Sequence, residues 1–262
     1  MEILTQAKAN PEEYENAMVD LKKAYINQAI LLSQHVMDDR VRFRQEEAEK
    51  AFGSVLNVQS HQTNLPDDFD PNAPRFVFQS SGKQLLLSKV AVQAVFGFED
   101  SAKSLKEQMS IIQKNFAKVS ERIPQFQTPT GEVGFVLNIN IPSLEDRVTL
   151  SDAVFNRYLK IPKIHKVAST SFKVGFETED CLFVNFEVDV YELKRLEMQL
   201  GVFPQAIDFS KLPINQMGYG IKVDINNKPR MGNFKDYSIE QQEVFVAMVD
   251  FIDNQLPRLV SL

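Results

Sequence analysis

Two parts of the chain place alternating apolar residues ahead of a long amphipathic helical pattern. In the first part, the stretch 75–97 precedes a helical pattern at 102–123, and in the second, stretches at 170–190 and 218–226 precede one at 238–256. Alternation puts apolar side chains on one face of a strand, and three-and-four spacing puts them on one face of a helix. The repeated order therefore predicts an α+β fold of two antiparallel sheet-plus-long-helix units.

The two units divide the chain near its middle, at residues 1–127 and 128–262. One continuous sheet in a single compact domain and two separate small domains are both compatible with this division. Residue identity between the halves is poor, so a tandem duplication and two convergent halves are both compatible with the pattern. In either case the helices at about 100–123 and 238–256 should lie on the same side of the sheet, related by an approximate two-fold.

The clearest strand signal lies in the second half. Apolar side chains there occupy the even positions Phe172, Val174, Phe176, Leu182, Val184, Phe186, Val188 and Val190. Further strands are predicted at 133–143, which alternates apolar residues with Asn138 and Asn140, and at 218–226. A helix is predicted around 151–159.

Two helices carry a well-defined apolar stripe. The first has apolar residues spaced by three and four at Ala102, Leu105, Met109, Ile112, Phe116, Val119 and Ile123. The second begins with a capping-box pattern at Ser238 and Gln241 and continues through Val244, Phe245, Met248, Phe251, Ile252 and Leu256. Each stripe is typical of a helix that covers one face of a sheet.

The first sixty residues are harder to interpret. Asn10 and Pro11 are suited to a helix start, and Tyr14, Met18, Leu21, Tyr25 and Leu32 continue a helical spacing. We expect this helix to run through residues 25–37 into a second segment that Gly53 closes, although 29–36 also has the pattern of a strand. Beyond a loop at 60–74, residues 76–78 and 83–96 are predicted to form a hairpin around a turn at 80–82.

Composition excludes several classes of protein. The 35 acidic and 29 basic residues give a net charge of −6, so the chain has no overall positive field that attracts nucleic acid. No apolar run is long enough to cross a bilayer, and the first residues lack the pattern of a signal peptide. We expect a cytoplasmic protein without a membrane partner, and nucleic acid is an unlikely partner.

The single cysteine, Cys181, excludes an internal disulfide and the Cys-x-x-Cys metal sites. A cysteine nucleophile needs a base, usually a histidine, and the three histidines lie far from it in the sequence. We therefore interpret Cys181 as structural or incidental.

Carboxylates on the polar strand face offer the other chemical possibility. Glu187 and Asp189 share a strand face, and Asp224 could lie beside them with Lys173 and Lys222. Such a group could hold Mg²⁺, but alternating polar residues are also what a solvated sheet face shows.

Phosphate-binding motifs are weak as well. Arg40, Arg42 and Arg44 lie among acidic residues that nearly cancel their charge, and neither a G-x-G-x-x-G nor a Walker loop occurs. The sequence thus assigns no residue to a catalytic, cofactor or metal site.

The order of several stretches resembles a known family. These are "PRFVFQSSGKQLLLSKVAVQAVFGF" at 74–98, "VGFVLNINIPS" at 133–143 and "VDIN" at 223–226, followed by a closing helix. Over residues 20–260 they are similar to a sporadically distributed bacterial family of uncharacterised proteins of about this length. This chain has "VLNINI" where the family favours a tyrosine, and the resemblance implies no activity. The ββββα order of the second half is similar to the export chaperone SecB in topology alone.

A binding protein fits these observations best. We expect a non-enzymatic bacterial accessory protein that binds another macromolecule, most simply another protein, and we predict no cofactor. A metal-dependent hydrolase or nuclease using Glu187, Asp189 and Asp224 is one alternative. The other is a holdase-like chaperone, which requires an exposed apolar groove. The pattern does not predict the oligomeric state.

Overall fold

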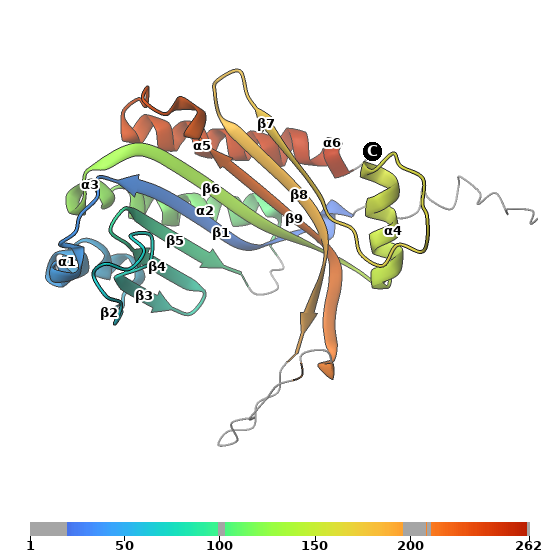
Figure 1. Ribbon diagram of the computed structural model, residues 1–262, viewed down its shortest axis with the longest axis horizontal. Coiled ribbons are helices and arrows are strands. Elements are labelled where there is room, and N and C mark those ends of the chain that lie inside the picture. Colours follow the sequence, from blue (N-terminus) through green and yellow to red (C-terminus); the bar gives the residue numbers. More distant parts are fainter. Residues whose placement is uncertain (1–19, 99–102, 196–207, 209–210, 261–262) are drawn as a thin grey trace, which may run out of the picture.

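A computed structural model describes residues 20–98, 103–195, 208 and 211–260 of the chain. Its centre is one antiparallel sheet with the strand order β2-β3-β4-β5-β1-β6-β9-β8-β7 (Figure 1). The strands are β1 (Tyr25–His35), β2 (Ser60–Gln62), β3 (Phe76–Ser80), β4 (Lys83–Leu87), β5 (Ala91–Gly97), β6 (Pro129–Ser143), β7 (Phe172–Glu177), β8 (Phe183–Lys194) and β9 (Ile214–Asn226). The α+β class and the sheet shared by both halves are therefore confirmed.

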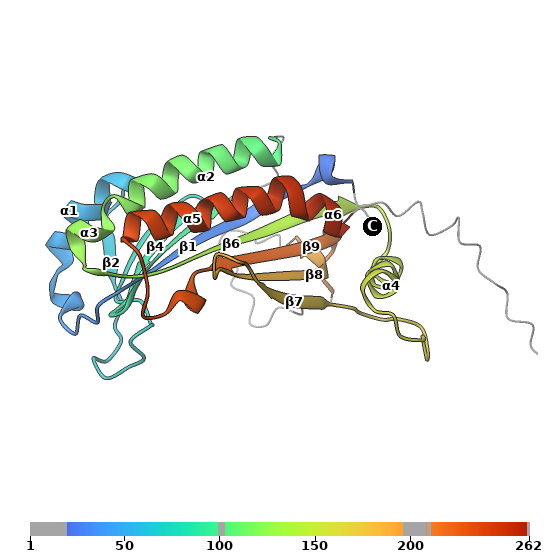
Figure 2. The ribbon, with the colours of Figure 1, turned by 90° about the horizontal axis from the view of Figure 1, so that it is seen from above.

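The two longest helices lie side by side across one face of this sheet (Figure 2). The helices are α1 (Gln45–Leu56), α2 (Leu105–Ser120), α3 (Ile123–Phe126), α4 (Arg147–Tyr158), α5 (Tyr237–Asp250) and α6 (Leu256–Val260). A π-helical turn, Phe251–Gln255, joins α5 to α6, and short 3-10 turns lie at Leu21–Lys23, Val41–Phe43 and Lys228–Arg230. The prediction that α2 and α5 share one side of the sheet is confirmed.

The halves repeat one order of elements. In the first half β1 and α1 precede the meander β3-β4-β5 and then α2, and in the second β6 and α4 precede β7-β8-β9 and then α5. In each half the last meander strand pairs with the first strand, and β1 pairs with β6 in the middle of the sheet. Common descent of the halves stays a hypothesis, as does the approximate two-fold.

Residues 25–35 form a strand, so the helix that the sequence favoured there is wrong. Ala29, Leu31 and Ser33 are buried beneath the helices, whereas the intervening Ile30 and Leu32 are half-buried on the other face. Over so short a stretch, the apolar residues fit the period of a strand and that of a helix equally well. Pairing with β5 and β6 on either side selects the strand. The proposed helix start at Asn10 lies outside the described residues.

Three predicted boundaries also differ. Gly53 does not close α1, which continues to Leu56 and ends at Asn57 in a left-handed conformation (φ 57°). The expected return strand 83–96 is two strands, β4 and β5. Between them the Ser88 hydroxyl accepts hydrogen bonds from the backbone N–H groups of Val90 and Ala91, and these bonds stabilise a turn. The N-cap of α5 is Asp236, whose carboxylate accepts from the Ser238 backbone N–H (2.9 Å).

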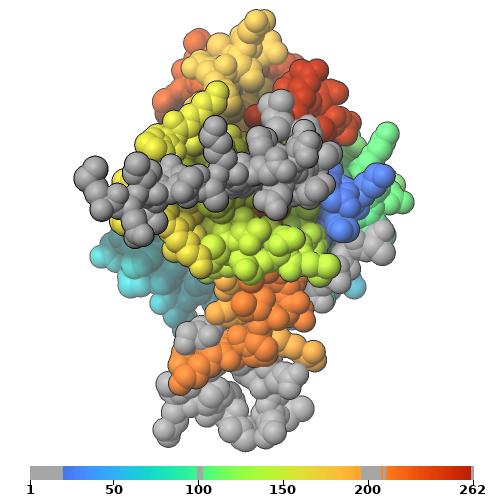
Figure 3. Space-filling model, turned by 90° about the vertical axis from the view of Figure 1, so that its right-hand side faces the viewer, coloured from blue at the N-terminus to red at the C-terminus, as the bar shows by residue number. Residues whose placement is uncertain are grey.

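The predicted strands of the second half and the helix at 102–123 are confirmed where the structure describes them. A capping box between Ser104 and Glu107 begins α2, and its stripe is buried against the sheet. Beyond the point where β6 ends, β8 and β9 continue as a two-stranded arm that projects from the body of the protein (Figure 3).

Phenylalanines join the two long helices to the sheet. The ring of Phe135, on β6, lies with its centroid 5.0 Å from that of Phe116 on α2 and 5.5 Å from that of Phe245 on α5. Phe116 in turn packs on Phe96 of β5 at 5.1 Å. This row crosses the boundary between the halves, so each helix is fixed to both.

We expect Phe135→Ala to lower the free energy of unfolding by about 3–5 kcal/mol, because it leaves a cavity beneath both helices. Phe43→Ala is the matched control, since the Phe43 side chain is 72% exposed, and should change the stability by less than about 0.5 kcal/mol. Urea unfolding followed by circular dichroism measures both. Equal effects of the two changes would show that Phe135 does not anchor the core.

Candidate functional site

The strand-face carboxylates lie on the sheet face opposite the long helices, each in its own setting. Glu187 on β8 is paired in register with Lys222 on β9 and with Lys173 on β7. The Lys173 Nζ lies 4.0 Å from a Glu187 carboxylate oxygen. Cross-strand pairs of opposite charge stabilise a sheet by themselves, so Glu187 needs no ligand to explain it.

Asp224 and Asp189 do not complete a metal site with Glu187. Asp224 lies opposite Asn185 and accepts hydrogen bonds from the amides of Asn185 (3.4 Å) and Asn226 (3.2 Å). Asp189 lies opposite Gly220, and burial, with the charge of Glu187, raises the pKa of its carboxyl. Within residues 20–98, 103–195 and 211–260, no three His, Cys, Asp or Glu side chains are grouped as metal ligands would be.

The other sequence candidates occupy ordinary surroundings. Cys181 is exposed in the β7–β8 turn, and its thiol has no hydrogen-bond partner in the described part of the chain. Arg42 pairs with Asp67 (2.7 Å), and Arg44 pairs with Asp38 (2.8 Å) and with Glu47. These arginines are neutralised by neighbouring carboxylates and leave no cluster of free positive charge there.

A groove with a volume of about 1000 Å³ lies between the edge strand β7 and the helices α5 and α6. We call it the α5 groove. Its floor is formed by the buried side chains of Leu182, Val184 and Ile225. Its walls carry Phe176 from β7 and Ile239 and Val246 from α5, which are 45%, 45% and 58% exposed. Large apolar side chains thus face solvent around an apolar floor.

A difference between the halves explains why this groove is open. In the first half α1 lies against β3, where Phe52 packs edge-on against Phe78 at 6.4 Å, and Phe76 and Phe78 are fully buried. In the second half α4 covers only one end of β7, where Tyr158 stacks on Phe172 at 4.6 Å. Phe176, at the other end of β7, has no such cover.

A second apolar face of α5 forms one wall. The stripe that faces the sheet, including Val244 and Met248, is buried as expected. Ile239 and Val246 lie seven residues apart, about two helical turns, and so share another face. The sequence prediction omitted them because it followed the stronger stripe. The signal was present: α5 is apolar on more than one face, which is unusual for a helix with a solvent side.

A buried polar network closes one end of the groove. The fully buried Glu240 carboxylate accepts hydrogen bonds from the Asn227 amide (2.7 Å), the Arg230 guanidinium (2.7 Å) and the Lys235 backbone N–H (2.7 Å). Arg230 also donates to the backbone carbonyl of Asp180 in the β7–β8 turn, at 2.9 and 2.7 Å. The network therefore fixes the turn at the groove's edge to the start of α5.

The network also sets the charge at this end. Burial alone would raise the pKa of Glu240, but hydrogen bonds from Asn227, the Lys235 backbone and Arg230 outweigh it and hold that pKa below its ordinary value. Glu243 accepts from both Arg230 and Lys235 at 2.6 Å. Positive and negative groups are thus matched here, and the groove as a whole selects for apolar character more than for charge.

No protein-family model matches the sequence, and the comparison with curated proteins finds no relative. None of the helices that the structure describes has the length and apolar character needed to pass through a lipid bilayer. The groove is therefore interpreted from its own chemistry.

We expect Glu240→Gln to lower the free energy of unfolding at neutral pH by about 2 kcal/mol, the scale of a hydrogen bond to a charged group. Because the folded-state pKa of Glu240 is lowered, its contribution is complete above the ordinary glutamate pKa and is lost as the pH falls through the folded-state value. The stabilities of the variant and the original protein should therefore converge in acid.

Urea unfolding across the acid range measures this convergence. Glu179→Gln is the control, since Glu179 is exposed in the same β7–β8 turn. A difference between Glu240→Gln and the original protein that stays constant down to strongly acid pH would contradict the lowered pKa of Glu240.

Proposed function

We propose that this is a non-enzymatic binding protein whose α5 groove holds an extended apolar segment of another polypeptide. The exposure of Phe176, Ile239 and Val246 around a buried apolar floor carries the proposal. Contiguous exposed apolar side chains in a hollow favour an interaction site over an ordinary surface. A cytoplasmic location is part of the proposal and rests on composition.

The edge strand favours an extended partner. In the described residues β7 pairs only with β8, so the outer edge of Phe172–Glu177 carries backbone groups without sheet partners. An extended segment beside β7 could satisfy these groups while its side chains enter the groove. Backbone pairing together with apolar pockets gives affinity without requiring one particular sequence.

The same features support a holdase-like chaperone as a second candidate. A protein of that kind needs an exposed apolar groove that tolerates many sequences, and the α5 groove combines an apolar lining with an open strand edge. The ββββα order that suggested a similarity to SecB is not present, because α4 lies between β6 and β7, so the analogy adds no support. The hydrolase alternative has less support, because Asp224 is engaged by the amides of Asn185 and Asn226 and Glu187 lies opposite Lys222.

Val246→Asp tests the groove directly. The side chain is 58% exposed, so the change should leave the fold intact, yet it puts a charge onto the apolar wall. We expect the affinity for fluorescently labelled, reduced and alkylated α-lactalbumin, an unfolded polypeptide, to fall at least about tenfold, or about 1.4 kcal/mol. Fluorescence anisotropy measures the binding.

Ile164→Asp is the matched control, because Ile164 is 87% exposed and lies outside the groove. It should bind the unfolded polypeptide as the original protein does. If the original protein suppresses aggregation of a heat-unfolded enzyme and Val246→Asp does not, the holdase candidate gains over a single-partner accessory role. Absence of any binding by the original protein, or equal binding by Val246→Asp, would overturn the groove proposal.

A further inference from the structure

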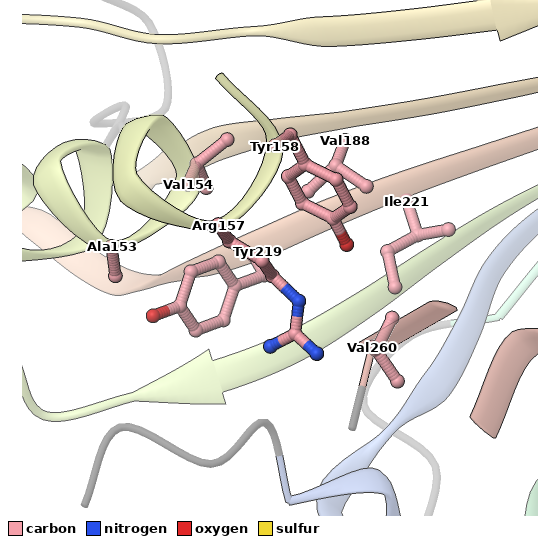
Figure 4. A pocket seen from close by; sticks show the side chains of 8 residues that line it. All are labelled: Ala153, Val154, Arg157, Tyr158, Val188, Tyr219, Ile221 and Val260. Atoms are coloured by element: carbon pink, nitrogen blue, oxygen red, sulfur yellow. The ribbon is translucent and has the colours of Figure 1, made fainter. Parts of the chain in front are cut away.

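A second, smaller pocket lies on the helix-covered face of the sheet, beyond the end of the α5 groove (Figure 4). Residues of α4, β8, β9 and α6 line it, and Arg157 of α4 extends its guanidinium among Tyr219, Ile221 and Val260. An aromatic cluster separates this pocket from the groove, since Phe186 packs against both Tyr158 (6.4 Å) and Phe251 (6.0 Å). The two hollows are therefore distinct.

Arg157 has no acceptor for two of its donors. Its Nε and Nη2 atoms are buried, and neither makes a hydrogen bond. Among the described residues no carboxylate forms an ion pair with it, and its guanidinium carbon lies 5.7 Å from the centroid of the Tyr158 ring. The Tyr158 hydroxyl is neutral and itself donates to the Leu259 carbonyl (3.0 Å). The charge of Arg157 is therefore unbalanced.

Two other buried arginines have more acceptors than Arg157, although the Nε of Arg75 also lacks one. Arg75 is fully buried and donates to the carbonyls of Ala73 (2.9 Å) and Phe69 (3.1 Å). Arg230 donates to two glutamates and a carbonyl. Buried donors without acceptors are costly, and a stacked tyrosine face does not satisfy N–H groups at the edge of the guanidinium. Arg157 thus offers two buried donors to an acceptor that the described residues do not supply.

We propose that the Arg157 pocket binds a carboxylate. The Nε–H and Nη2–H bonds of an arginine lie parallel on one edge of the guanidinium, the arrangement that pairs with both oxygens of a carboxylate. One negative charge balances the one positive charge. The remaining walls, including Val154, Val188 and Ile221, are apolar, so the further oxygens of a phosphate would lack donors there.

The space in the pocket agrees with a small head group. Its free volume of about 20 Å³ is slightly more than one water molecule needs, so only the carboxylate oxygens would enter and the rest of the ligand would lie outside. The carboxylate could come from a free small acid or from a polypeptide, as a side chain or a terminus. A single ordered water is the alternative occupant, and the experiment separates the three.

Thermal unfolding and calorimetric titration with isobutyrate test the proposal, with isobutyramide as the neutral isostere and chloride at matched ionic strength. We expect isobutyrate alone to raise the melting temperature, and Arg157→Gln to weaken its binding at least tenfold. Arg147→Gln is the control, because Arg147 lies on the same helix but pairs with Glu192 at 3.0 Å. It should respond as the original protein does.

A short apolar peptide with a free C-terminal carboxylate, compared with its C-terminal amide, identifies the source. A response to the peptide acid and not to isobutyrate would assign the carboxylate to a polypeptide, and a response to isobutyrate would assign it to a free acid. No response to either would mean a water only, and it would overturn the proposal.

Arg157→Met supplies an independent readout. If the Arg157 guanidinium is unpaired without a ligand, its removal should raise the melting temperature of the unliganded protein, because a buried unpaired charge is destabilising. The variant should also lose the response to carboxylates. A lower melting temperature in Arg157→Met, with responses to carboxylates unchanged, would show that Arg157 only supports the fold.

Discussion

The antiparallel pairing of β1 with β6 is the interaction on which the rest of the structure depends. It joins the two halves in the middle of one sheet and brings the helix of each half onto the same face. The side-chain amide of Gln108 on α2 accepts from the Ile26 backbone N–H at 2.8 Å, close to the irregularity in β1 between Ile26 and Gln28. The position of α2 is thereby fixed to the central pair, and the Phe135 row fixes α5.

Given this frame, one asymmetry decides where the protein can bind. The first half closes its meander with α1, and its apolar strand residues are buried. The second half places α4 at the far end of the meander, so the end that includes Phe176 stays open beside α5. The incompletely covered second half therefore has the α5 groove at the β7 edge of the sheet.

Much of this fold could be predicted from local pattern. Alternation over Phe172 to Val190 and the stripes of α2 and α5 were sufficient, because each reports a face buried against one neighbour. The strand β1 was missed because its short apolar run fits both periods, and only long-range pairing with β5 and β6 selects the strand. The sequence pattern also predicted one strand in place of β4 and β5, because it did not show the turn that the Ser88 hydroxyl stabilises between them.

The candidate sites were less predictable, because each depends on a missing neighbour: a covering helix at the α5 groove and hydrogen-bond acceptors at Arg157. Val246 is an ordinary helical valine until the position of α4 leaves it uncovered. Arg157 is an ordinary basic residue until packing leaves its donors without acceptors. The carboxylates Glu187, Asp189 and Asp224 showed the converse, since a shared strand face suggested a metal site, but the register places Lys222 opposite Glu187 and Asn185 opposite Asp224.

The central claim is that an extended polypeptide lies along β7 in the α5 groove, and hydrogen exchange tests it most directly. With reduced and alkylated α-lactalbumin added, the amides of Phe172–Glu177 should exchange more slowly. Those of Ser60–Gln62, in β2 at the opposite edge of the same sheet, should not change. Unchanged exchange in β7, or equal protection at both edges, would contradict the account.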